Sequence, residues 1–110
     1  MNVYNDAHRL ANSIKKSKEY EEYLKNKEKV DSDKKTKKMV DDFRKKLMKT
    51  QMEHLSGKEI DEEEAERLQN LEEVLMLNPT IRDYFMAEIK FSQLISDVYN
   101  IIEDAIDIDE

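Results

Sequence analysis

The segment Ser56-Gly57-Lys58-Glu59-Ile60-Asp61 separates two long helical patterns and reverses the direction of the chain. Gly57 suits the left-handed backbone position that follows a helix end. Asp61 and Glu64 have the spacing of a capping box, which starts a new helix. A short polar turn between two long helices predicts an antiparallel helical hairpin.

Apolar residues recur at helical spacing on both sides of this turn. Before it they predict a helix over about 33–55, which follows the stop and restart signal Asp31-Ser32-Asp33. After it they predict a helix over about 61–77. The apolar positions are Met39, Val40, Phe43, Leu47, Met48, Met52 and Leu55, then Ala65, Leu68, Leu71, Val74 and Leu75.

The N-terminal segment, residues 1–31, is also helical by its pattern. A first helix starts near Asn2 or Asn5, and Ser17 can cap a second helical stretch. The pattern leaves open whether a real break separates the two stretches. The apolar positions are Val3, Ala7, Leu10, Ala11 and Ile14, then Tyr20, Tyr23, Leu24 and Val30.

The last helix is predicted over about 78–108, where Asn78 caps a helix that begins at Pro79. Of the 28 residues 81–108, 16 are apolar, which covers about half of the helix surface or more. Such a helix needs neighbours on two sides, as the centre of a bundle or as part of a subunit interface. At about 42 Å it is also long for a compact chain of this size, which favours a homodimer.

Six residues of this helix are the candidates for core packing and self-association. They are Phe85, Phe91, Leu94, Ile95, Val98 and Ile102.

Composition agrees with an all-α protein. The 110 residues include one Gly, one Pro and no Cys, and 41% are charged. We therefore predict an elongated antiparallel helical hairpin or bundle of about four to five helices that dimerises through the long C-terminal helix. The whole chain forms one helical domain, made of an N-terminal segment 1–31, a hairpin 33–77 and the last helix 78–108.

The net charge of −7 argues against general affinity for nucleic acids or anionic membranes. The charge is uneven, with +5 in residues 1–60 and −12 in residues 61–110. The N-terminus lacks the pattern of a signal peptide, and no stretch is apolar enough for a membrane span. We expect a cytoplasmic protein.

No residue pattern predicts catalysis, a metal or a cofactor. A di-iron site in a bundle needs Glu-x-x-His, but Asn5 and Gln51 stand three residues before His8 and His54. An EF-hand loop starting at Asp31 would place Thr36 where Gly is needed. Without Cys there is neither a disulfide nor a thiolate ligand. We expect a protein that is not an enzyme.

A basic run over residues 34–49 carries eight Lys and Arg against two Asp. One interpretation is a solvated face that attracts the acidic helix across the hairpin. The alternative is an RNA-binding module, although aromatic rings for base stacking are not interleaved with the lysines. The candidate contacts are Lys34, Lys35, Lys38, Lys45 and Lys49.

Several short motifs, in order, resemble the YlbF/YheA/YmcA-like helical proteins of bacteria, the Com_YlbF superfamily. They cover nearly the whole chain. They are Asn2-Val3-Tyr4-x-x-Ala7-x-x-Leu10-Ala11, Ser17-x-Glu19-Tyr20, Asp42-Phe43-Arg44, Leu55-Ser56-Gly57-Lys58-Glu59 and Asn78-Pro79-x-Ile81-Arg82-Asp83-Tyr84-x-x-Ala87-Glu88-x-x-Phe91-Ser92-x-Leu94.

The resemblance implies an all-α dimer or higher oligomer without catalytic activity. Members regulate competence, sporulation and biofilm formation, some of them in a complex that directs ribonuclease Y to its transcripts. Iron–sulfur clusters in that complex are held by Cys, so cluster binding is not carried over to a chain without Cys. The leading hypothesis is a cytoplasmic, self-associating helical adaptor that binds other proteins.

Overall fold

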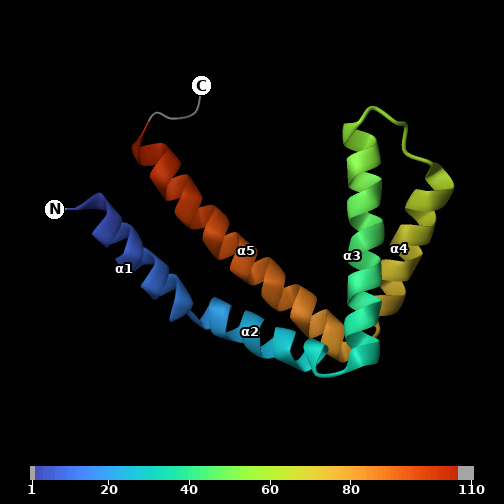
Figure 1. The fold of residues 1–110 in the computed structure, drawn as a ribbon, viewed down its shortest axis with the longest axis horizontal. Helices are drawn as coiled ribbons and strands as arrows, with labels where there is room; N and C mark the ends of the chain where they lie inside the picture. The colour runs from blue at the N-terminus through green and yellow to red at the C-terminus, as the bar shows by residue number, and fades with distance from the viewer. Residues whose placement is uncertain (1, 107–110) are drawn as a thin grey trace. The chain divides into compact units, whose positions relative to one another are not determined.

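The computed structural model describes residues 2–106, which form five α-helices and no strand (Figure 1). This confirms the predicted all-α class. The helices are α1 (Val3–Lys15), α2 (Lys18–Asp31), α3 (Lys34–Leu55), α4 (Glu62–Met76) and α5 (Pro79–Ala105). The predicted end of the last helix, residues 107 and 108, lies outside the described residues.

The chain divides into two compact units. Among the described residues, unit 1 contains 2–27 and 84–106, and unit 2 contains 28–83. Helices α2 and α5 each contribute residues to both units. That residues 1–110 act as one domain stays a prediction.

Unit 2 is built on the predicted hairpin, in which α3 and α4 lie side by side (Figure 1). Gly57 has a φ of 94° directly after the end of α3. The Lys58 N–H donates to the Glu53 carbonyl at 3.1 Å, and the Gly57 N–H donates to the His54 carbonyl at 3.1 Å. These two bonds form a Schellman motif, so the predicted role of Gly57 is confirmed.

The start of α4 differs in detail from the predicted capping box. The Asp61 side chain caps the helix, but it accepts its hydrogen bond from the Glu63 N–H at 3.0 Å. A capping box would use the N–H of Glu64 and return the Glu64 carboxylate to Asp61. The Glu64 side chain instead lines the space between α3 and α4.

The core of unit 2 collects residues that are far apart in the sequence. The end of α2 and the start of α5 each place a fully buried side chain there, Val30 and Ile81. The hairpin itself buries Val40, Phe43 and Leu75. Burial of this apolar surface stabilises the unit, at about 25 cal/mol for each Å².

The junction between α4 and α5 follows the prediction. The Asn78 side chain accepts hydrogen bonds from the N–H groups of Thr80 at 2.9 Å and Ile81 at 3.3 Å. Pro79 is the first residue of α5, where its missing N–H costs nothing.

Unit 1 shows that the break near Ser17 is real. The Ser17 Oγ donates to the Ile14 carbonyl at 2.6 Å and accepts from the Tyr20 N–H at 3.2 Å. It thereby closes α1 and caps α2. At the other end of α1, the Asn2 side chain accepts from the Tyr4 N–H at 2.8 Å, so the helix starts at the first of the two predicted positions, Asn2 and not Asn5.

Candidate functional site

A cluster of aromatic rings joins α2 to α5 within unit 1. Phe91 of α5 lies 5.1 Å from Tyr20 and 5.4 Å from Tyr23, measured between ring centroids. Tyr23 also stacks on Tyr84 at 5.9 Å. Tilted and offset ring pairs at these distances are favourable. The sequence placed these residues on helix faces, but nothing in it indicated that the two faces meet.

The six residues predicted for core packing and self-association are not equally covered. Phe85, Phe91, Leu94 and Val98 are half-buried. Ile95 and Ile102 are 41% and 43% exposed. The chain therefore covers one side of the apolar surface of α5 and leaves the adjoining side open. The role of the six residues at an interface stays a prediction.

The open side of α5 forms a stripe that we call the outer face, made of Ile95, Tyr99 and Ile102. These residues are spaced by four and three, which places them on one side of the helix. Tyr99 is 56% exposed. Isolated exposed apolar residues are ordinary, whereas large contiguous apolar patches are typical of binding surfaces.

A second open apolar surface lies on α1, which contains no buried residue. Val3 and Tyr4 are 79% and 77% exposed, and Leu10 is 38% exposed. Figure 1 shows α1 and the C-terminal part of α5 as two separate rods of unit 1. Two of the helices that build unit 1 therefore present apolar residues to solvent.

The basic run lies on α3 of unit 2. At 100° per residue, Lys34, Lys35, Lys38, Lys45 and Lys49 fall within an arc of about 100°. The same side also carries acids, since Lys38 pairs with Asp42 at 3.2 Å and the neighbouring Lys37 pairs with Asp41 at 3.0 Å. These pairs reduce the positive potential that a nucleic acid would meet. Contact of these lysines with RNA stays a prediction.

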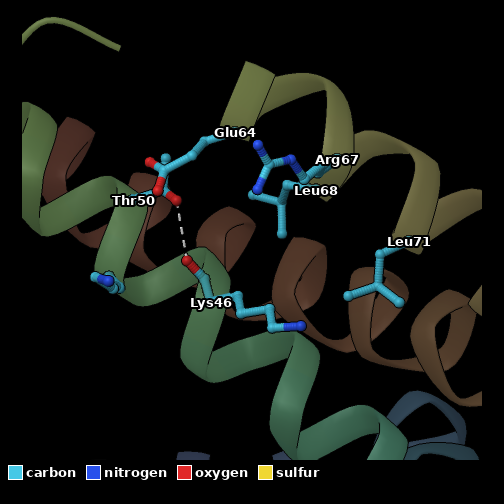
Figure 2. Close-up of a pocket in the computed structure, with 7 residues that line it drawn as sticks. Lys46, Thr50, Glu64, Arg67, Leu68 and Leu71 are labelled. Atoms are coloured by element: carbon cyan, nitrogen blue, oxygen red, sulfur yellow. Dashed lines mark hydrogen bonds between the residues drawn. The ribbon is translucent and has the colours of Figure 1, made fainter. Parts of the chain in front are cut away.

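A cleft of about 350 Å³ lies between α3 and α4 (Figure 2). Leu68 and Leu71 of α4 form its apolar wall and point toward α3. Basic side chains, Lys46, Lys49 and Arg67, surround it, together with one carboxylate, Glu64, and Thr50. The Thr50 hydroxyl donates to the Lys46 carbonyl at 3.0 Å. No pattern in the sequence indicates this cleft.

One carboxyl group has a clearly altered pKa. The side chain of Asp33 accepts a hydrogen bond from the Thr36 hydroxyl at 2.9 Å and another from the Lys35 N–H at 3.1 Å. These bonds, the hydroxyl first, hold the pKa of Asp33 below its ordinary value. Asp33 is the N-cap of α3, so the ionised form serves to start that helix.

Neither a metal site nor a membrane-spanning helix occurs within residues 2–106. No group of three or more His, Cys, Asp or Glu residues in this range could hold a metal ion. No described helix is long and apolar enough to cross a membrane.

The fold defines a small all-α protein whose most prominent surface features are uncovered apolar helix faces and a basic cleft in a helical hairpin. The amino-acid sequence assigns this protein to one family within that class. The chain belongs to the Com_YlbF family, described as control of competence regulator ComK, YlbF/YmcA, whose model matches residues 3–107. The resemblance inferred from the sequence motifs is thereby confirmed.

Relatives match over nearly the full length of the chain. UPF0342 protein STH1710 of Symbiobacterium thermophilum is 42% identical over 107 residues, which are 97% of this chain and 96% of the relative. A UPF0342 protein of Caldicellulosiruptor saccharolyticus is 36% identical over 107 residues, which are 97% of this chain and 89% of the relative.

Two solved structures share the fold. A protein of unknown function (DUF964) from Bacillus stearothermophilus superimposes with a TM-score of 0.86 at 19% identity, covering 94% of this chain and 90% of the other. A chain from the crystal structure of Bacillus subtilis RicA in complex with RicF gives a TM-score of 0.64 at 22% identity, covering 94% and 91%.

Proposed function

We propose that this chain is a non-enzymatic, cytoplasmic regulatory adaptor that forms a homodimer or higher oligomer and binds other proteins. The observation that carries the proposal is the outer face of α5, where Ile95, Tyr99 and Ile102 are 41%, 56% and 43% exposed. Placing this stripe against a second copy removes it from water, and the apolar surface of α1 can extend the contact.

Membership of the Com_YlbF family supports a regulatory role rather than catalysis. A chain of related fold occurs in the complex of RicA with RicF, which supports binding to other proteins. By this analogy we propose that the adaptor takes part in the regulation of RNA processing, competence, sporulation or biofilm formation, in a complex that controls a ribonuclease.

A capture experiment tests the binding role. The tagged chain, an Ile102→Asp variant and an Asn100→Asp variant are used as baits in a lysate, and the retained proteins are identified by mass spectrometry. Asn100 is exposed on the opposite side of α5, so its substitution adds the same charge away from the outer face. We expect proteins that the chain and Asn100→Asp retain and Ile102→Asp loses. Identical sets for all three baits would contradict an adaptor that works through this face.

The alternative function, RNA binding, has one supporting observation, the arc of five lysines on α3. It predicts that RNA is retained in a filter-binding assay and that the affinity falls steeply with salt. The absence of retention at low salt would remove this alternative, and it would leave the adaptor role unaffected.

A further inference from the structure

We infer that the cleft between α3 and α4 binds the acidic segment 103–110 of a second copy of this chain. The inference rests on the self-association proposed above, and it adds a second contact that does not use the outer face of α5. It is carried by the matching chemistry of the cleft and of the segment.

The cleft combines positive charge with an apolar wall. Lys46 and Lys49 are exposed, and neither forms an ion pair with any residue between 2 and 106. Arg67 pairs with the exposed Glu63 at 3.4 Å. With Glu64 as the one acid among the residues around the cleft, the rim is positive and the wall of Leu68 and Leu71 is apolar. Such a site suits a peptide that alternates carboxylates with apolar side chains.

The positive surface continues along α3 beyond the cleft. A shallow depression next to it is lined by three lysines and one carboxylate together with Met48, Met52 and Ser56; the charged residues are Lys45, Lys49, Lys58 and Glu53. The two methionines are 61% and 64% exposed. Methionine side chains adapt their shape to bound peptides, so this extension can accommodate a segment longer than the cleft itself.

Segment 103–110 has the complementary sequence, Glu-Asp-Ala-Ile-Asp-Ile-Asp-Glu. It carries five carboxylates, no basic residue and two isoleucines. Ile106 is 49% exposed in the single chain. Residues 59–66 are another acidic run, but they already form the turn and the first residues of α4 beside the cleft. Segment 103–110 is therefore the occupant that we assign to the cleft.

A peptide of residues 103–110 with a fluorescent label tests the assignment by anisotropy against the full chain. Because the chain's own segments compete for the cleft, the assay also uses a variant with Asp107→Asn, Asp109→Asn and Glu110→Gln. We expect this variant to bind the peptide more tightly than the unmodified chain does. A peptide in which both isoleucines are serine is expected to bind more weakly, since it keeps the charge but loses the contact with Leu68 and Leu71.

Two charge reversals locate the site. In the Asp107→Asn, Asp109→Asn, Glu110→Gln background, Lys46→Glu with Lys49→Glu is expected to weaken binding about tenfold or more, because it reverses two charges at the cleft. Lys34→Glu with Lys35→Glu makes the same change in net charge at the far end of α3, and the expected effect is about twofold or less. Circular dichroism checks the fold, and Lys46→Gln with Lys49→Gln replaces the first pair if it does not fold.

The results separate this inference from the proposed function. Equal weakening by the two lysine pairs, or no binding at low salt, would overturn the assignment. An oligomer that fails to bind the peptide overturns only the assignment. A chain that stays monomeric and yet binds the added peptide contradicts the proposed self-association, and it shows a cleft that accepts an acidic peptide without joining two copies.

Discussion

Tyr23 of α2 and Phe91 of α5 stack with their ring centroids 5.4 Å apart and an angle of 22° between the ring planes. This contact, with that of Tyr20 on Phe91, joins two helices of unit 1 that lie far apart in the sequence. Beyond Phe91, the exposed residues Ile95 and Ile102 follow on α5. The rings therefore lie on the covered side of α5, next to the side on which Ile95 and Ile102 are exposed.

Phe91→Ala is expected to lower the free energy of unfolding by about 2 kcal/mol. The substitution removes the ring contacts with Tyr20 and Tyr23, and the value lies below that for a fully buried Phe because Phe91 is half-buried. Urea unfolding followed by circular dichroism measures the change. Phe91→Leu retains most of the apolar volume and serves as the control with a smaller loss. An unchanged unfolding curve for Phe91→Ala would show that the cluster contributes nothing.

Ile102→Asp is expected to weaken the oligomer without unfolding the chain, because Ile102 is 43% exposed and the new carboxylate lies on the outer face. Leu94→Asp is expected to dissociate the oligomer and to lower stability as well, since Leu94 is half-buried. Sedimentation velocity reports the assembly. Asn100→Asp is the matched control and should stay assembled. If Ile102→Asp and Asn100→Asp sediment alike, the outer face is not the interface.

Gly57→Ala is expected to destabilise the chain by about 1 kcal/mol. A Cβ at this position meets no atom within 4 Å, so the cost comes from the φ of 94° and not from a clash. Gly57→Asn should cost less, because Asn tolerates the left-handed region better than Ala does. Chemical unfolding ranks the three chains. Equal stability of Gly57→Ala and the unmodified chain would disprove the backbone argument.

The lowered pKa of Asp33 predicts a pH-dependent cap on α3. A group whose folded pKa is depressed stabilises the fold above its unfolded pKa, which is about 3.9 for Asp, and this contribution is lost as the pH falls through the folded value. Stability should therefore decline in acid more steeply for the unmodified chain than for Asp33→Asn, whose cap does not titrate.

The cause of the shift can be tested separately. Thr36→Val removes the hydroxyl that donates to Asp33 and preserves the size of this buried side chain. NMR titration of the Asp33 carboxyl carbon should then show a pKa closer to the ordinary value. An unchanged pKa would mean that the hydroxyl is not the main cause.

The sequence predicted the local structure well because local signals determine it. Gly57 ends a helix and Asn78 caps one, both at the predicted positions. Such ends are predictable because a left-handed residue or a side-chain acceptor must lie within a few positions of the helix end. The sequence predicts Ser17 as a cap, but its pattern leaves open whether α1 and α2 are separate helices. The Ser17 hydroxyl forms hydrogen bonds with the end of α1 and the start of α2, so the two are separate helices.

The candidate surfaces were less predictable, because they depend on which helices meet. The apolar surface of α5 is wider than one helix face, which predicts that neighbours cover the helix on two sides. In the single chain, Ile95 and Ile102 are exposed to solvent. The ring cluster of Tyr23 and Phe91 and the cleft beside Lys46 required the packed structure. They depend on side chains from separate helices, and a single sequence does not contain that pairing.

Static light scattering on the unmodified chain after size exclusion measures whether copies of the chain associate. We expect a mass of twice the 13.1 kDa chain or a higher multiple, since the outer face of α5 stays open in a single copy. A uniform mass of 13.1 kDa at concentrations well above the micromolar range would contradict it.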